Sequence, residues 1–479
     1  MAVIDAERLL TAAQCDELFR RVQALARGGG YSSLMAESWW QGELRWGRNR
    51  VSLSSERRDI RLTVHRRAET GGSGSVVTNQ LDDASLESAV RAAERMAQLG
   101  ATPGRGFGFY PKLPEYEPYT KNRIWSDATY NLDTEARGAE ARSMIELAEK
   151  QGMLAAGYLE VRGASRALLG DDYPELRSNP HAFWHLPYTR WTHAHCSTTV
   201  RDSKGTGSGW AGASSYDWNA VQSGALAERA LEKCLASRDP VAVEPGRYTV
   251  ILEPQAVADI VEALANTLRQ REQPEQGHGP WYLGFDDALR LYRSKLGLKV
   301  VDERITIEHD PADPLLGILM GVTEWPEPVK WITNGVLTNL GHHLSTDIMQ
   351  LEGHHHLRGP DGYRMSGGTT SIEEMIATTK RGLLVTRFSN LRGLDGRSLL
   401  LTGLTRDGLW LIENGKITKP VKNFRFTESP LVVLNSIEQL GEPVPVFRPA
   451  RSAFGSPTPA IVPPLKVRDF SFTSLIDAV

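Results

Sequence analysis

Clustered histidines are the residues of this sequence whose type and spacing best suit a metal-binding or catalytic site. The chain has 12 histidines, most of them in four clusters: His181 and His185, His193 and His195, His342 and His343, and His354 to His356. Imidazole nitrogens bind zinc, and alternate residues of a strand share one face. His193 and His195 are therefore the better metal candidates. We interpret the runs of adjacent histidines as solvated or hydrogen-bonded loop residues.

Motifs that would make the chain an enzyme by itself are missing from the sequence. Ser208 lies between Thr206 and Trp210, which occupy the glycine positions of a nucleophile elbow. The glycine-rich run at 104–108 lacks the final spacing of a dinucleotide loop, and neither HExxH nor a phosphate-binding GxxxxGK[ST] occurs. We therefore predict no catalytic residue in this chain.

Composition limits the class of protein. With 479 residues and 41% hydrophobic residues, the chain is long enough for two or three cores. A formal net charge of −3 gives no reason to expect nucleic acid. The three cysteines, Cys15, Cys196 and Cys234, form no CxxC pair. With no signal peptide and no stretch long enough to span a membrane, we expect a cytoplasmic protein that binds no membrane.

The order of elements predicts an α+β fold with antiparallel or mixed sheets and packed helices. In the first half, we expect a helix over 5–27 and two antiparallel strands within 31–67, with turns at Gly42 and at Gly47 to Asn49. Further helices are predicted at 85–99, 133–151 and 220–237, and strands at 158–169, 193–202 and 210–218. The many arginines between 45 and 67 are interpreted as solvated faces and edges of the strands.

The segment 237–246 has two prolines and few packing residues, so we place a domain boundary there. The predicted domains are 1–238, an α+β domain, and 239–479, a mostly β domain with a proline-rich tail. The second should begin with a buried strand and a long helix. It should also contain a two-residue hairpin turn at Asn414 and Gly415, and a helix over 430–440.

The second half resembles the TldD/PmbA family of peptidases, which work as dimers of related subunits. Six segments carry the resemblance, and they keep the family's order: 250–254, 331–340, 359–368, 371–376, 379–385 and 410–422. Active members carry HExxxH on the helix after the first of these segments, and a later cysteine completes a zinc site. Zinc would then activate water beside a glutamate base.

The positions of that motif, counted from Pro254, hold Glu262, Ala263 and Thr267 in this chain. No histidine lies between His195 and His278, and the last cysteine is Cys234. All three zinc ligands are therefore absent together. The resemblance implies the family's metal-free subunit, of the TldE/PmbA type, which carries no cofactor and shapes a cavity that it shares with a zinc-bearing sister chain.

We therefore expect a subunit of a TldD/TldE-like metallopeptidase complex that acts on unfolded peptides. The expected partner is a TldD-like zinc-bearing paralogue, in a heterodimer. The alternative is a non-proteolytic peptide-binding or scaffold homodimer. A peptidase with a site rebuilt from His193, His195 and the 354–356 run is a third hypothesis. For peptide binding, the sequence offers only the loop of Arg364, Met365, Gly367 and Gly368, whose glycines a tight turn would explain equally well.

Overall fold

Two groups of sheets make up the protein, which we describe from a computed structural model. The structure describes residues 8–27, 30–69, 71–100, 124–171, 186–310, 313, 315–316, 328–341, 362–448 and 459–476. Its elements confirm an α+β fold. No helix among these residues is long and apolar enough to cross a membrane.

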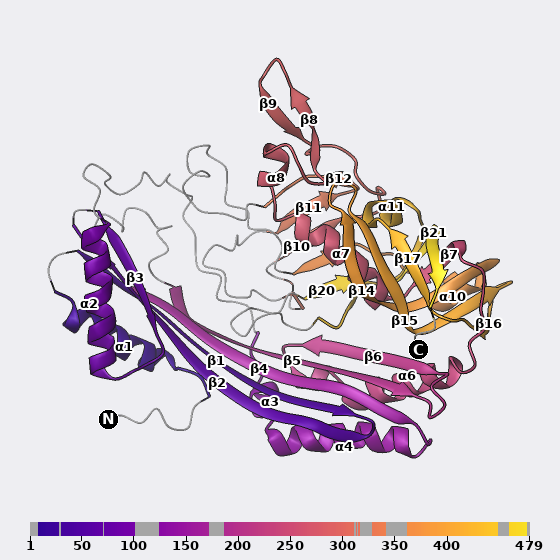
Figure 1. Cartoon of the computed structure of the whole chain (residues 1–479), viewed down its shortest axis with the longest axis horizontal. Helices are drawn as coiled ribbons and strands as arrows, with labels where there is room; N and C mark the ends of the chain where they lie inside the picture. The colour runs from indigo at the N-terminus through magenta and orange to yellow at the C-terminus, as the bar shows by residue number, and fades with distance from the viewer. Residues whose placement is uncertain are drawn as a thin grey trace.

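A six-stranded antiparallel sheet forms the first part, in the order β3-β2-β1-β4-β5-β6. Its strands are β1 (Tyr31–Gly47), β2 (Arg50–Arg67), β3 (Ser73–Thr78), β4 (Leu154–Gly170), β5 (Leu186–Arg201) and β6 (Ser208–Ser215). Four of them are unusually long, and they run together as one curved band (Figure 1). Each side chain on this sheet therefore has neighbours on the same face at a spacing of two residues.

Helices cover one face of this sheet. They are α1 (Ala12–Leu25), α2 (Asp83–Leu99), α3 (Asp127–Tyr130), α4 (Thr134–Glu149) and α6 (Ser223–Ala236), with a short 3-10 helix, η1 (Trp218–Ala220). Figure 1 shows α1 and α2 at one end of the band and α4 towards the other. Two apolar clusters follow this division, one joining Leu34 to Val90 and one joining Leu44 to Met144.

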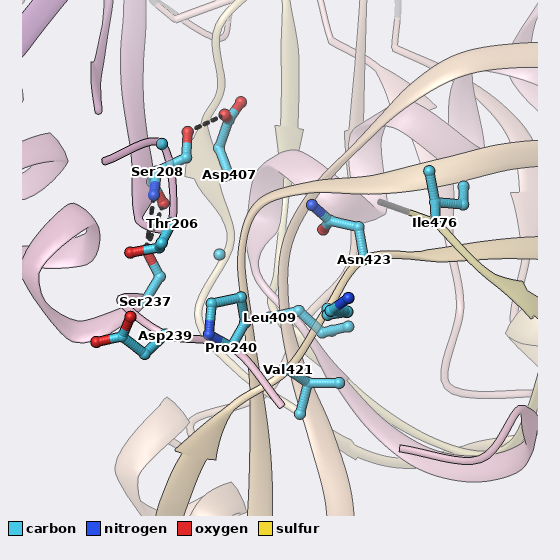
Figure 2. A pocket seen from close by; sticks show the side chains of 13 residues that line it. Thr206, Ser208, Ser237, Asp239, Pro240, Asp407, Leu409, Val421, Asn423 and Ile476 are labelled. Carbon is cyan, nitrogen blue, oxygen red and sulfur yellow. Dashed lines mark hydrogen bonds between the residues drawn. The ribbon is translucent and has the colours of Figure 1, made fainter. Parts of the chain in front are cut away.

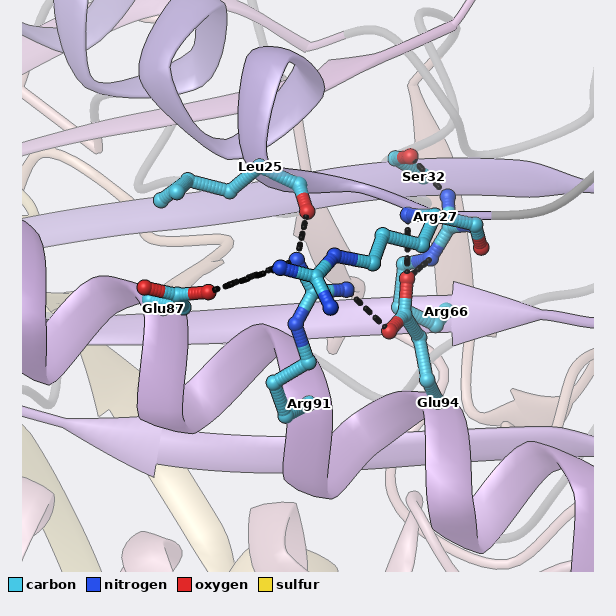
Figure 3. Close-up of polar contacts among 7 residues, drawn as sticks. All are labelled: Leu25, Arg27, Ser32, Arg66, Glu87, Arg91 and Glu94. Atoms are coloured by element: carbon cyan, nitrogen blue, oxygen red, sulfur yellow. Dashed lines mark hydrogen bonds and ion pairs between the residues drawn. The ribbon is translucent and has the colours of Figure 1, made fainter.

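A charged cluster fixes α2 against the end of α1 (Figure 3). The Glu94 carboxylate accepts a hydrogen bond from the Arg27 backbone N–H at 2.6 Å and pairs with Arg91 at 2.6 Å. Arg91 also donates to the carbonyl of Leu25, the last residue of α1, at 2.6 Å. Arg66 lies 3.6 Å from Glu94 and only 4% of its side chain is exposed. Arg66 is thus buried, against our expectation of solvated arginines, because Glu94 and Ser32 hold its guanidinium.

The second part contains a ring of five strands, β14-β7-β21-β17-β15, which closes because β14 also pairs with β15. These strands are β7 (Gly246–Leu252), β14 (Arg381–Asp395), β15 (Leu400–Glu413), β17 (Phe424–Glu428) and β21 (Leu465–Leu475). The edge strand β16 (Lys416–Pro420) pairs with β15, and β18 (Ile437–Leu440) pairs with β21. In the core of the second part, ring strands β14, β17 and β21 bring together the side chains of Phe388, Phe426 and Phe470. Their ring centroids lie 4.5 to 5.7 Å apart.

A second sheet of short strands lies beside the ring, in the order β12-β11-β10-β13-β20-β19. The strands are β10 (Ile307–His309), β11 (Val329–Thr333), β12 (Val336–Leu337), β13 (Tyr363–Met365), β19 (Val444–Pro445) and β20 (Ala460–Val462). Strands β8 (Tyr282–Asp286) and β9 (Leu291–Ser294) form a separate hairpin. The helices are α7 (Pro254–Thr267), α8 (Glu272–Glu275), α10 (Ile372–Ala377) and α11 (Pro430–Asn435).

Local differences from the sequence predictions have clear causes. Helix α1 begins at Ala12, because Thr11 and Gln14 form a capping box there. Gly42 is no turn and lies inside β1, where a Cβ would come within 2.4 Å of the buried Arg137 guanidinium. Helix α11 ends at Asn435, because the chain continues as β18. The Asn414–Gly415 turn is confirmed, with φ angles of 52° and 78°.

Among the strands that the structure describes, none pairs across the two parts, and the large apolar clusters divide between Cys234 and Val250. The domain boundary at 237–246 stays a prediction. Whether the two parts fold as independent domains stays a prediction.

Candidate functional site at the junction of the two parts

The face of the long sheet opposite its helices carries polar side chains that are nonetheless buried. On β5, Trp191, His193 and His195 alternate onto this face, as the period of two requires. His195 lies opposite Glu160 of β4, and His193 lies opposite Arg162. These four charged or titratable side chains are at most 6% exposed, so their polar atoms need partners within the protein.

Of these four side chains, the two imidazoles have the fewest hydrogen bonds. Their ring centroids lie 5.7 Å apart. Within the described residues, neither ring donates or accepts a hydrogen bond; both nitrogens of His195 and Nδ1 of His193 are buried. His195 packs between the rings of Tyr158 and Phe447, at 5.0 and 5.5 Å. The pair is therefore held by packing.

Both imidazoles are neutral at physiological pH. Desolvation, together with the smaller effect of the nearby Arg162 charge, lowers the pKa of His195 to about 3. Desolvation also holds the pKa of His193 well below its usual value, with added repulsion from His195 and Arg162. Neutral imidazoles can bind metals or donate a single hydrogen bond.

A metal site at this pair would need further ligands. The nearest carboxylate, Glu160, lies 4.0 Å from Nδ1 of His195. It already accepts hydrogen bonds from Arg162 at 2.9 Å and from Gln41 at 2.6 Å. In the described part of the chain, no three His, Cys, Asp or Glu residues are placed to hold a metal ion. The run 354–356, which the rebuilt-site hypothesis also used, lies outside the described residues.

Helix α7 carries the positions that the family motif would use for zinc. Glu262 forms an ion pair with Arg448 at 3.0 Å. The Thr267 hydroxyl donates to the carbonyl of Leu264 at 2.7 Å and accepts from the Trp281 indole at 3.1 Å. Ala263 has no ligating atom. These three side chains do not fit a zinc ion, because only Glu262 carries a usual zinc-ligating group and its carboxylate is already paired with Arg448.

A second carboxylate on α7, Asp259, is half-buried. It accepts hydrogen bonds from the backbone N–H of Phe388 at 2.9 Å and from Gln255 at 3.0 Å. Desolvation raises the pKa of Asp259 to about 6, although these hydrogen bonds and Arg387 act in the opposite direction. A buried carboxyl group with such a pKa is typical of functional sites, but also of structural networks.

The junction cavity, as we call a space of about 250 Å³, lies between β5, β6 and the segment 445–448. Its walls are mostly apolar, and His193, Ser214 and Arg448 are among its polar lining residues. The Arg448 backbone N–H donates to the Ser214 hydroxyl at 2.9 Å. Arg448 is therefore fixed by contacts to both parts of the chain, since its side chain pairs with Glu262.

Tyr363 is a further buried polar residue beside this cavity. Its strand pairs with β20 at Ala460, which lines the cavity. Desolvation raises the pKa of Tyr363 to about 12, with smaller effects of Arg448 and Asp259. Within the described residues, its hydroxyl has no hydrogen-bond partner.

The loop predicted to bind peptide is largely occupied by the protein itself. Arg364 pairs with Asp313 at 2.6 Å, and Met365 is fully buried. A Cβ on Gly367 would lie 2.4 Å from the Gly441 carbonyl, and one on Gly368 would lie 2.5 Å from the Leu440 carbonyl. Internal packing thus accounts for both glycines, and a substrate role for this loop stays a prediction.

Another pocket, of about 440 Å³, lies where the first part meets the ring of strands (Figure 2). Ser208 of β6 donates to the Asp407 carboxylate at 2.6 Å, and the Ser237 hydroxyl accepts from the Ser208 N–H at 2.9 Å. The Asp407 carboxylate also pairs with Arg387. The contact between Ser208 and Asp407 joins the two parts. Among the described residues that line this pocket, no buried polar atom lacks a hydrogen-bond partner that a ligand could replace.

Comparison with known proteins agrees with the resemblance in the sequence. Residues 245–474 match the family model of the PmbA/TldA metallopeptidase C-terminal domain. No curated protein matches the chain. The second part is thus a domain of the metallopeptidase class. Residues 245–474 belong to the TldD/PmbA family.

Solved structures share the fold over almost the whole chain. A proposed modulator of a DNA gyrase from Thermotoga maritima has 16% identity and a TM-score of 0.72, over 96% of this chain and 100% of its own. TldE from Thermococcus kodakarensis has 16% identity and a TM-score of 0.72, over 97% and 100%. A proposed modulator of DNA gyrase from Bacteroides thetaiotaomicron has 17% identity and a TM-score of 0.71, over 98% and 100%.

Three residues of the junction were not found by sequence reasoning: Asp259, Tyr363 and Arg448. Asp259 had a signal, because it is a carboxylate that lies directly between the buried apolar residues Ala258 and Ile260 of α7. Tyr363 and Arg448 had none, since they are more than 80 residues apart and meet only through the pairing of β13 with β20.

Proposed function

We propose that this chain is the metal-free subunit of a TldD/TldE-like metallopeptidase complex that acts on unfolded peptides. It completes the cavity of a zinc-bearing partner and supplies no zinc ligand itself. The observation that carries this proposal is that the motif positions of α7 hold side chains that already contact other residues of the chain. Glu262 is paired with Arg448 and Thr267 is bonded to Trp281, where an active relative would present imidazoles.

Family membership and a fold shared with TldE over nearly the whole chain support this proposal. A chain of this family that has replaced its zinc ligands with internally paired residues gains nothing catalytic from the helix. Such a chain can still contribute to the complex by shaping the shared cavity and by providing a surface that binds peptide.

Reconstitution with a zinc-bearing TldD-type paralogue tests the proposal. We expect a stable complex, and cleavage of an unfolded peptide by the mixture but not by this chain alone. A chelator should abolish the cleavage. Glu262→Gln in this chain is the matched control: the amide can still accept a hydrogen bond from Arg448, so the complex should cleave as before.

Two outcomes would contradict the proposal. Cleavage by this chain alone would show that it carries its own catalytic site. A homodimer that ignores the paralogue and binds peptide without cleaving it would establish the non-proteolytic scaffold instead.

A further inference from the structure

His193 is the polar side chain of the junction cavity that is placed to bind an occupant. It lines the cavity, is 6% exposed and forms no hydrogen bond within the described part of the chain. Its Nδ1 is fully enclosed, which leaves Nε2 as the nitrogen that can reach an occupant. By contrast, the Thr192 hydroxyl donates to the Tyr216 carbonyl at 3.0 Å, and the Ser214 hydroxyl accepts a backbone N–H at 2.9 Å. An occupant that hydrogen-bonds to His193 would satisfy a group that native structures rarely leave unpaired.

The cavity offers an occupant no free charge among its described lining residues. Arg448 is the one charged side chain in that set, and its guanidinium is paired with Glu262 at 3.0 Å. His193 is neutral, because desolvation holds its pKa well below the usual value. An ion that entered the cavity would lose its hydration without gaining a counter-charge, which is costly. The occupant that fits is therefore uncharged.

The walls of the cavity define the size and polarity of the occupant. They are mostly apolar, with contributions from Ile124, Ala213, Leu316, Val446 and Pro459. A volume of about 250 Å³ is below the roughly 300–1,000 Å³ of pockets for drug-sized ligands. The space therefore suits one apolar side chain and not a larger ligand.

A peptide group is the uncharged partner that suits His193 in either tautomer. A neutral imidazole nitrogen donates a hydrogen bond when it carries the proton and accepts one when it does not. The backbone on either side of a side chain presents both C=O and N–H groups. A residue inside a peptide therefore brings an apolar side chain and the matching polar groups together.

We propose that the junction cavity binds one apolar side chain from the interior of a peptide, and that His193 hydrogen-bonds the peptide group beside it. The walls receive a side chain of about leucine size. This inference deepens the proposed function and rests on it for the peptide origin of the ligand. The site is tested by binding to this chain alone, without a partner subunit and without cleavage.

Calorimetric titration of the full chain tests the site with three small probes: N-acetyl-leucine methylamide, N-acetyl-glycine methylamide and N-acetyl-leucine. The first should bind at least about ten-fold more tightly than the glycine probe, because the walls bury the leucine side chain. It should also bind at least about ten-fold more tightly than N-acetyl-leucine, whose carboxylate would find no free counter-charge.

A blocked tripeptide, acetyl-Ala-Leu-Ala-amide, separates a peptide from a free small amide. It should bind at least as tightly as N-acetyl-leucine methylamide. Much weaker binding of the tripeptide would show that the cavity admits only a free small molecule, and would overturn the peptide origin.

His193→Phe keeps a ring of similar size but removes the hydrogen bond. It should weaken binding of N-acetyl-leucine methylamide by about five-fold or more. His278→Phe is the matched control, because it makes the same substitution at an exposed histidine that does not line the cavity. It should bind as the wild type.

Ala213→Leu tests the walls independently of His193. Ala213 is half-buried and lines the cavity, so the larger side chain would occupy space that the ligand needs, and binding should be lost. Ala13→Leu, at an exposed position of α1, is the matched control and should bind normally.

Four results would each overturn the site: equal binding of the leucine and glycine probes, tighter binding of the carboxylate, no binding of any probe, or unchanged binding in both His193→Phe and Ala213→Leu. Any of them would leave the proposed role in a peptidase complex standing, because that role is tested by cleavage with the paralogue.

Discussion

Asp259 and Glu262 lie one turn apart on α7, but their surroundings give them different chemistry. Glu262 is neutralised by Arg448. Asp259 is half-buried, and desolvation raises its pKa to about 6. The folded state therefore keeps this proton to a higher pH than the unfolded chain does.

The pKa of Asp259 predicts how stability depends on pH. Between about pH 4 and pH 6 the folded state binds more protons at this group, so stability falls as pH rises through that window. At about 1.4 kcal/mol per pKa unit, the total is roughly 3 kcal/mol. Asp259→Asn keeps an acceptor for the Phe388 N–H and should remove this slope. Urea unfolding measured from pH 4 to pH 7 checks it.

Asp302→Asn is the control for that measurement. Hydrogen bonds from Arg304 lower the pKa of Asp302 to about 2, so its stabilising effect is lost only as pH falls below about 4. The variant should keep the wild-type slope between pH 4 and pH 6. An Asp259→Asn protein with that same slope would show that the carboxyl group is ionised throughout.

At the scale of elements, Glu94 is the residue that ties α1 to α2. Glu94→Gln should destabilise the protein by about 2 kcal/mol, because Arg66 would be left buried without its counter-charge. Glu87→Gln is the matched control, since Glu87 lies on the same helix and contacts two of the same arginines, but is exposed. Its effect should stay within about 0.5 kcal/mol.

Chemical denaturation of both variants checks this difference. Equal stability of the Glu94 and Glu87 variants would mean that the cluster in Figure 3 contributes little and that apolar packing alone holds the helices.

Sequence patterns predicted most elements, because alternation and helical periodicity are local. The hairpin of β1 and β2, helices α2 and α4, and the Asn414–Gly415 turn all follow from neighbouring residues. Gly42 was misassigned because its cause is Arg137, about a hundred residues away. The junction cavity could not be predicted, since it forms only when β6 meets the segment 445–448.

At the scale of the whole molecule, the site lies where two separately packed parts meet. Ser208 and Asp407 on one side, and Ser214 and Arg448 on another, link β6 to the second part. The His193 and His195 pair belongs to the first part, and Glu262 and Thr267 of α7 belong to the second.

The zinc content of the purified chain tests the central claim most directly. Elemental analysis after expression with added zinc, and after dialysis without chelator, should give far less than one zinc per chain. The physical reason is that Glu262, Ala263 and Thr267 supply no imidazole or thiolate. One tightly held zinc per chain, lost on replacing His193 and His195, would contradict the account and establish a rebuilt metal site in this subunit.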